Sequence, residues 1–145
     1  MPIKVLTIDD DLAMTELISL LLKTYGYEVL VANNGEMGLK MIREESPDLV
    51  LLDLMMPGMD GWEVCRTTRS FSDVPIIILS ALDNPGMVAG ALDEGADDYL
   101  IKPVPSGVLV AHLKKLTRRV TGSLSPLAAE KKPANFIAGS NPMPS

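Results

Sequence analysis

Short apolar runs and longer amphipathic stretches alternate along the chain as far as about residue 120. The short runs are continuous and do not alternate with polar residues, which is typical of strands buried on both faces of a parallel sheet. In the longer stretches apolar residues recur every three or four positions, which predicts helices with one buried face. The alternation of these two patterns predicts an α/β fold with a parallel sheet.

The boundaries follow from turn and capping residues. Strands are expected at residues 3–8, 28–32, 48–53, 75–79 and 99–101, and helices at residues 12–26, 36–45, 62–70, 85–95 and 108–120. Asp11 stands where a helix N-cap belongs, Gly26 ends the first helix, and Asn33-Asn34-Gly35 is a turn signal. The strand at 28–32 is interpreted as a less apolar strand, which suits the edge of the sheet.

Apolar residues also predict which helix faces are available for burial. The stripes are Leu12, Leu17, Leu20 and Leu21 in the first helix; Met37, Leu39, Met41 and Ile42 in the second; and Leu109, Leu113, Leu116 and Val120 in the last.

Polar residues follow directly after four of the expected strands. Asp9 and Asp10 follow the first strand, Asp53 ends the third, Ser80 follows the fourth and Lys102 follows the fifth. In an open α/β sheet, ligands bind in the crevice outside the carboxyl ends of the strands. Three acids, one hydroxyl and one lysine at that edge predict a small site for a cation and a phosphate group.

Composition and charge limit the function further. The chain has 145 residues, 47% of them hydrophobic, and a formal net charge of −6. This length fits one domain with a short extension, and the acidic balance argues against direct nucleic-acid binding. No apolar stretch is long enough to cross a bilayer, and no signal peptide is visible, so a cytoplasmic protein is expected. With His112 and Cys65 as the single histidine and cysteine, a His/Cys zinc site cannot form.

The composition changes near residue 121. Gly, Ser, Pro and Asn make up half of residues 122–145, which predicts a disordered C-terminal tail after a folded domain of residues 1–121.

Separated motifs in this chain resemble the receiver domain of two-component response regulators. They are Asp9-Asp10, Asp53 within Leu-Asp-Leu-Met-Met-Pro-Gly-Met-Asp-Gly, Ser80-Ala81, and the stretch from Asp97 to Lys102-Pro103. The resemblance implies a flavodoxin-like (CheY-like), doubly wound sheet of five parallel strands in the order 2-1-3-4-5, with five helices. It also implies that Asp53 accepts a phosphoryl group from a histidine kinase or histidine phosphotransfer protein, in a phosphorelay that signals to a protein effector.

The resemblance assigns a role to each site residue. Asp53 would be the nucleophile. Mg²⁺ would be held by Asp10, Asp53 and the backbone carbonyl of Met55, with Asp9 acting partly through water. Lys102 and the Ser80 hydroxyl would pair with phosphoryl oxygens, a cis bond would join Lys102 to Pro103, and Ser80 and Tyr99 would form the conformational switch.

Other functions remain open at this point. A pseudo-receiver would bind partners without phosphorylation, and the chain could be the receiver fragment of a longer regulator. A hydrolase of the haloacid dehalogenase type usually carries a second acid two residues past its nucleophile, where this chain has Met55. We therefore expect a phosphoacceptor that signals to a protein partner, and neither a turnover enzyme nor a membrane protein.

Two further expectations concern positions where family members vary. Winged-helix members dimerise through charge pairs, of which Asp98 and Arg119 match one, whereas Val88, Val108 and His112 replace charged residues. We therefore expect a monomer or a weak dimer. Met55 and Leu82 occupy the positions that tune loss of the phosphoryl group, and neither suits hydrogen bonding to a water, which predicts slow self-dephosphorylation.

Overall fold

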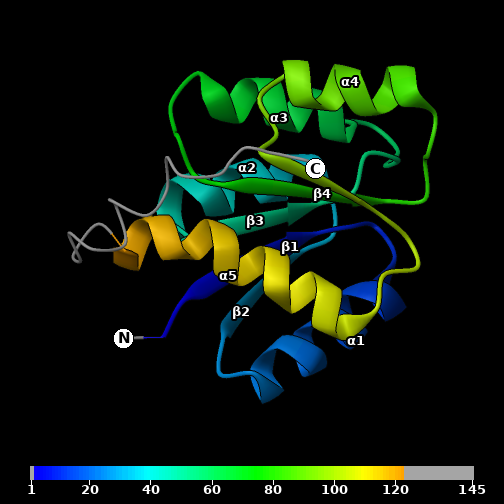
Figure 1. The fold of residues 1–145 in the computed structure, drawn as a ribbon. Helices are drawn as coiled ribbons and strands as arrows, with labels where there is room; N and C mark the ends of the chain where they lie inside the picture. The colour runs from blue at the N-terminus through cyan, green and yellow to red at the C-terminus, as the bar shows by residue number, and fades with distance from the viewer. Residues whose placement is uncertain (1, 123–145) are drawn as a thin grey trace.

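The structure, a computed structural model, describes residues 2–122, and the side chains as far as residue 118. Strands and helices alternate along this part of the chain (Figure 1). The elements are β1 (Lys4–Ile8), α1 (Leu12–Thr24), β2 (Glu28–Ala32), α2 (Gly35–Glu45), β3 (Leu49–Leu52), α3 (Gly61–Arg69), β4 (Ile76–Ser80), α4 (Pro85–Asp93), β5 (Asp98–Ile101) and α5 (Ser106–Gly122).

The five strands form one parallel sheet in the order β2-β1-β3-β4-β5. The predicted fold, strand order and edge position of β2 are confirmed. Strand ends differ from the prediction by one residue at most because the ladder, not the apolar run, decides them. Ser80 lies inside β4 since it pairs with Ile101, and Asp98 lies inside β5 since it pairs with Ile77.

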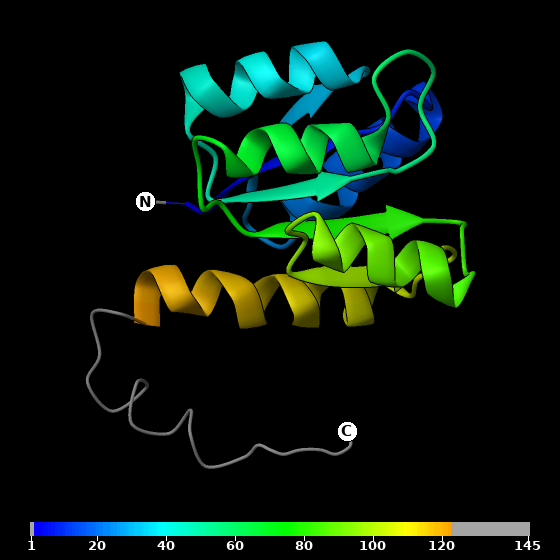
Figure 2. The ribbon, with the colours of Figure 1, turned by 90° about the horizontal axis from the view of Figure 1, so that it is seen from above.

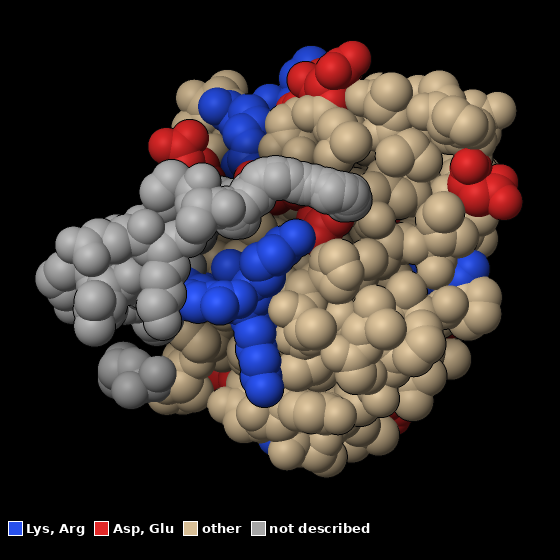
Figure 3. Space-filling model, in the orientation of Figure 1, with Lys and Arg blue, Asp and Glu red and all other residues tan. Residues whose placement is uncertain are grey.

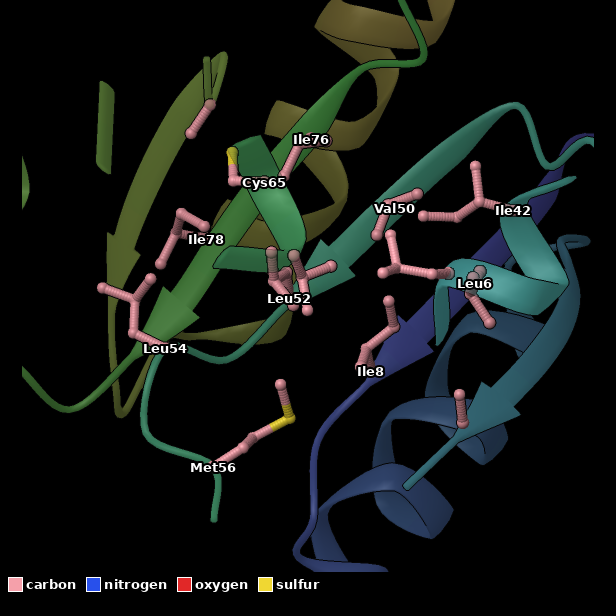
Figure 4. Close-up of a cluster of buried hydrophobic side chains, with 14 of the residues drawn as sticks. Leu6, Ile8, Ile42, Val50, Leu52, Leu54, Met56, Cys65, Ile76 and Ile78 are labelled. Atoms are coloured by element: carbon pink, nitrogen blue, oxygen red, sulfur yellow. The ribbon is translucent and has the colours of Figure 1, made fainter. Parts of the chain in front are cut away.

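Two hydrophobic cores lie on opposite faces of the sheet. Alternate residues of the central strands enter each core: Val50 and Leu52 pack beneath α2, α3 and α4, and Leu49 and Leu51 pack beneath α1 and α5. Figures 1 and 2 show these two helical layers, and Figure 4 shows the core beneath α2 and α3, which includes the fully buried Cys65. Burial on both faces explains why the strands are continuous apolar runs.

The predicted buried stripe of α1 is wrong at Leu12, Leu17 and Leu20, whereas Leu21 is half-buried against the core. Leu12, Leu17 and Leu20 are each more than 60% exposed, whereas the buried residues of this helix are Thr15, Ile18 and Leu22. Leucines occur on every side of α1, so periodicity alone cannot identify its inner face. Thr15 tolerates burial because its hydroxyl donates to the carbonyl of Leu12 at 3.0 Å.

The predicted buried stripes of α2 and α5 agree more closely with the structure. In α2, Leu39 and Ile42 are buried as predicted, but Met37 is 44% exposed. In α5, Leu109, Leu113 and Leu116 are buried as predicted; the side chain of Val120 lies outside the described part.

Two further predictions concern the C-terminal tail and membrane-spanning helices. The predicted C-terminal tail lies outside the described residues, except for Gly122 at the end of α5. Within residues 2–122, no helix combines the length and apolar character that a membrane span requires.

Candidate functional site

The polar residues predicted to converge do lie at one edge of the sheet. Ile8 and Leu52 are register partners, so Asp9 and Asp53 leave neighbouring strands side by side. Ser80 pairs with Ile101, which places the residue after β5 next to the end of β4. Asp9, Asp53 and Ser80 are 5%, 8% and 0% exposed, so the floor of the site is buried.

Three carboxylates form the acidic part of the site. Asp9, Asp10 and Asp53 each contribute an oxygen, and these oxygens lie within 4.8 Å of one another. Asp10 is exposed, whereas the other two are buried. Carboxylate oxygens are the ligands that Mg²⁺ prefers, and an opening to water suits an ion that keeps several of its waters. The donor set therefore fits a hard divalent cation.

Burial is the main influence on the Asp53 carboxyl. It raises the pKa above the usual value, and the nearby Asp9 carboxylate acts in the same direction. Lys102 and hydrogen bonds from the Met55 N–H and the Ser80 hydroxyl lower it, without cancelling the effect of burial. Burial and the Asp9 carboxylate therefore disfavour the charged form of Asp53, and a bound cation would stabilise it.

Lys102 belongs to the same cluster, but its partner is Asp9. Its Nζ donates to Asp9 Oδ2 at 2.9 Å, while Asp9 Oδ1 accepts the backbone N–H of Asp11 at 3.0 Å. Both Asp9 oxygens are therefore engaged. The expected cis bond between Lys102 and Pro103 is present, and Asp11 caps α1 by accepting the Met14 N–H, as predicted.

A glycine lets the loop after Asp53 lie close to a helix. A Cβ on Gly61 would come within 2.4 Å of the Asp53 carbonyl oxygen. The N-terminus of α3 can pack against this backbone only because the residue has no side chain.

One residue of the site was not identified from the sequence. Asn33, predicted only as part of a turn, directs its side-chain amide at the loop between β1 and α1. Its Nδ2 donates to the Asp9 carbonyl at 2.9 Å and to Thr15 Oγ1 at 3.3 Å. The available signal was an amide residue just past β2, beside the end of β1.

Comparisons with known proteins agree with this geometry. A family model described as the response regulator receiver domain matches residues 5–114. The chain belongs to the receiver family of response regulators. It is 46% identical over 114 residues to the transcriptional regulatory protein AfsQ1 of Streptomyces coelicolor, covering 79% of this chain and 51% of that protein. It is 42% identical over 116 residues to the DNA-binding response regulator MtrA of Mycobacterium tuberculosis, covering 80% and 51%.

Solved structures give the same result. The BeF3-activated N-terminal receiver domain of Klebsiella pneumoniae RstA matches with a TM-score of 0.77 and 37% identity, over 79% of this chain and 98% of that one. A two-component response regulator from Clostridium difficile matches with a TM-score of 0.79 and 30% identity, over 81% and 98%. The chain spans about half the length of the curated relatives it matches.

Tyr99 connects β5 of this receiver to the loop after β4. Its hydroxyl donates to the Leu82 carbonyl at 2.7 Å, and its ring packs against the core beneath α2, α3 and α4. Ser80 Oγ accepts the Leu82 N–H at 3.3 Å. Burial raises the pKa of Tyr99, so the phenol keeps its proton at neutral pH. The Leu82 backbone thus connects Ser80 with Tyr99.

Apolar side chains border the receiver site on the side of the β3–α3 loop. A hollow of about 420 Å³ there is lined by Leu54, Met55, Met56, Pro57, Asp60 and Trp62. Met55 is 59% exposed and Leu82 is half-buried. The two positions predicted to tune dephosphorylation lie in the β3–α3 loop and the β4–α4 loop.

His112 has a partner that the sequence did not reveal. Its Nδ1 lies 2.5 Å from Asp98 Oδ2, and Lys115 Nζ lies 3.8 Å from the same oxygen. Lys and Arg side chains gather over α5 in the view of Figure 3, and the exposed Lys114, Lys115 and Arg118 belong to this helix. Asp98 therefore already has partners within its own chain, on the face that carries the predicted dimer pair. The Arg119 side chain of that pair lies outside the described residues.

Proposed function

We propose that this receiver accepts a phosphoryl group on Asp53 from a histidine kinase or a histidine phosphotransfer protein. The observation that carries the proposal is a buried carboxylate with an oxygen within 4.8 Å of oxygens from Asp9 and Asp10, and beside Lys102. A carboxylate oxygen of Asp53 would attack phosphorus, the phosphorus–nitrogen bond of the donor would break, and the leaving imidazole would take up a proton. The product would be an aspartyl phosphate.

Mg²⁺ is the cation that this donor set fits best. Asp10 and Asp53 would bind it directly, together with the Met55 carbonyl, while Asp9 would act partly through water because both its oxygens already have partners. The ion would neutralise charge on the carboxylates and on the transferring group.

Lys102 and Ser80 would hold the transferred group. The ammonium group is a mobile point charge 2.9 Å from Asp9, so it can turn to a phosphoryl oxygen once a cation compensates Asp9. The Ser80 hydroxyl would exchange its bond with the Asp53 carboxylate for one with the phosphate. Because the Leu82 backbone bonds both to Ser80 and to Tyr99, that exchange would reach the β4–α4 loop and give a switch.

We infer that the output of this domain is contact with a protein partner in the cytoplasm, and that the receiver is a stoichiometric phosphoacceptor and not a turnover enzyme. The net charge of −6 disfavours nucleic acid as a direct ligand of this domain. AfsQ1 and MtrA are named as transcriptional and DNA-binding regulators, and this chain aligns with about half of each. A receiver fragment of a longer regulator is therefore the second candidate.

The test is phosphorylation by acetyl phosphate with Mg²⁺, followed by intact-mass and peptide analysis. We expect a single phosphoryl group on Asp53, released by hydroxylamine, and none when EDTA replaces Mg²⁺. Asp53→Asn should take up nothing, and Asp60→Asn, which alters a nearby acid that caps α3, should behave as the wild type. A folded protein that incorporates no phosphate would instead be a pseudo-receiver that only binds partners.

A further inference from the structure

The loop that carries Asp10 begins where the β1–β2 ladder ends. The Asp9 N–H donates to the Ala32 carbonyl at 3.1 Å. In a parallel ladder, the carbonyl of the same residue would then accept the backbone N–H two residues further along β2, that of Asn34. However, β2 ends at Ala32, and Asn34 has turned away to cap α2.

The side chain of Asn33 takes over the missing ladder bond. Its Nδ2 donates to the Asp9 carbonyl at 2.9 Å, the acceptor that regular pairing would have satisfied from Asn34. The amide group has a second N–H, and Thr15 Oγ1 lies 3.3 Å from the same nitrogen. Thr15 is 3% exposed and is itself fixed by its bond to the Leu12 carbonyl.

One amide group therefore contacts both ends of the β1–α1 loop, the last residue before Asp10 and the first turn of α1 after it. Asp10 is exposed and lies between these two anchors. An exposed carboxylate on a short loop keeps one position only if the backbone on both sides is held.

We propose that Asn33 is a positioning residue for the cation-binding loop, an inference that rests on the function proposed above. It does not bind the ion. It fixes the backbone that presents Asp9 and Asp10. The loop is therefore ordered before the cation binds, and binding does not bear the entropy cost of ordering it. Removing a residue that orients metal ligands without binding the metal typically lowers metal affinity by about 10- to 100-fold.

The first measurement is Mg²⁺ affinity, by calorimetric titration of the whole chain. We expect Asn33→Ala and Asn33→Ser, whose side chains cannot reach the Asp9 carbonyl, to bind Mg²⁺ about tenfold more weakly or worse. The matched control is Asn34→Ala, which removes the N-cap bond to the Met37 N–H at 2.7 Å. It should lower the melting temperature and leave Mg²⁺ affinity unchanged.

The second measurement needs no metal. In EDTA, the backbone N–H of Asp11 bonds to Asp9 Oδ1 at 3.0 Å, so its hydrogen exchange reports on the order of the loop. It should speed up several-fold in Asn33→Ala and stay at the wild-type rate in Asn34→Ala.

The outcomes separate this inference from the proposed function. If wild type binds Mg²⁺ and is phosphorylated, but Asn33→Ala matches Asn34→Ala in affinity and in exchange, the positioning role is refuted and the proposed function stands. If wild type neither binds Mg²⁺ nor accepts phosphate, the proposed function fails. The exchange comparison in EDTA then still decides whether Asn33 orders the loop.

Discussion

Replacing Asp53 by asparagine should abolish phosphorylation and make the metal-free protein more stable. The substitution keeps the shape of the side chain and removes a buried negative charge. Repulsion from Asp9, with oxygens up to 4.8 Å apart, amounts to about 3 kcal/mol at an effective dielectric constant of about 20. Attraction to Lys102 opposes this repulsion.

The remaining term is the cost of burying a charged carboxylate, which the hydrogen bonds from Met55 and Ser80 offset in part. An asparagine oxygen can still accept one of these bonds. We therefore expect a net gain of about 1 to 2 kcal/mol at pH 7, the range typical of a buried polar group that is incompletely compensated. For a domain of this size, the melting temperature would rise by about 3 °C or more.

The pH dependence gives the sharper test. Because the folded pKa of Asp53 is raised, its contribution to stability is fully present below its ordinary value of 3.8 and is lost as the pH rises through the folded value. The advantage of Asp53→Asn should therefore be largest at neutral pH and shrink as the pH falls toward 3.8.

Urea unfolding in EDTA, followed through the fluorescence of Trp62, the single tryptophan, measures this difference. Asp97→Asn is the control of opposite sign, because the Asp97 carboxylate accepts the Ile76 N–H at 2.8 Å and Arg69 Nη2 at 2.9 Å. That variant should lose stability. A large loss in Asp53→Asn at pH 7, or a difference that does not change with pH, would refute the electrostatic reasoning and make Asp53 a structural residue.

Two further predictions concern the phosphorylated protein. Self-dephosphorylation with Mg²⁺ should be slow, because Met55 and Leu82 offer no hydrogen bond to an attacking water. Met55→Asn and Leu82→Glu should each speed the decay of labelled protein several-fold, and unchanged rates would contradict this explanation. Sedimentation with Mg²⁺ and beryllofluoride should show a monomer or a weak dimer, because Asp98 Oδ2 already has a partner in its own chain, His112 Nδ1 at 2.5 Å. A tight dimer built on the face that carries Asp98 would overturn this expectation.

Several features could be predicted from the sequence because they depend on the local order of residue types. Continuous apolar runs identified strands buried on both faces, and the polar residues at the ends of four of these runs identified the site. Asp53 and Lys102 are 49 positions apart, yet parallel pairing brings all strand ends of one sense to the same edge. That rule needs no knowledge of side-chain packing, so the sequence alone predicts which residues form the site.

The inner face of α1 could not be predicted in this way. Its leucines surround the helix, and the sheet selects Ile18 and Leu22 while leaving Leu17 and Leu20 in water. When leucines occur on every side of a helix, the side that is buried depends on how the helix crosses the sheet, a property of the assembled layers.

Contacts between distant polar side chains were also decided only by the tertiary structure. Lys102 pairs with Asp9, Asn33 continues the ladder beyond β2, and His112 reaches Asp98. Sequence determines which residues follow each strand, because strand and turn signals are local. The partner of a side chain depends on distances of a few ångströms between elements, and only the packed fold sets those distances.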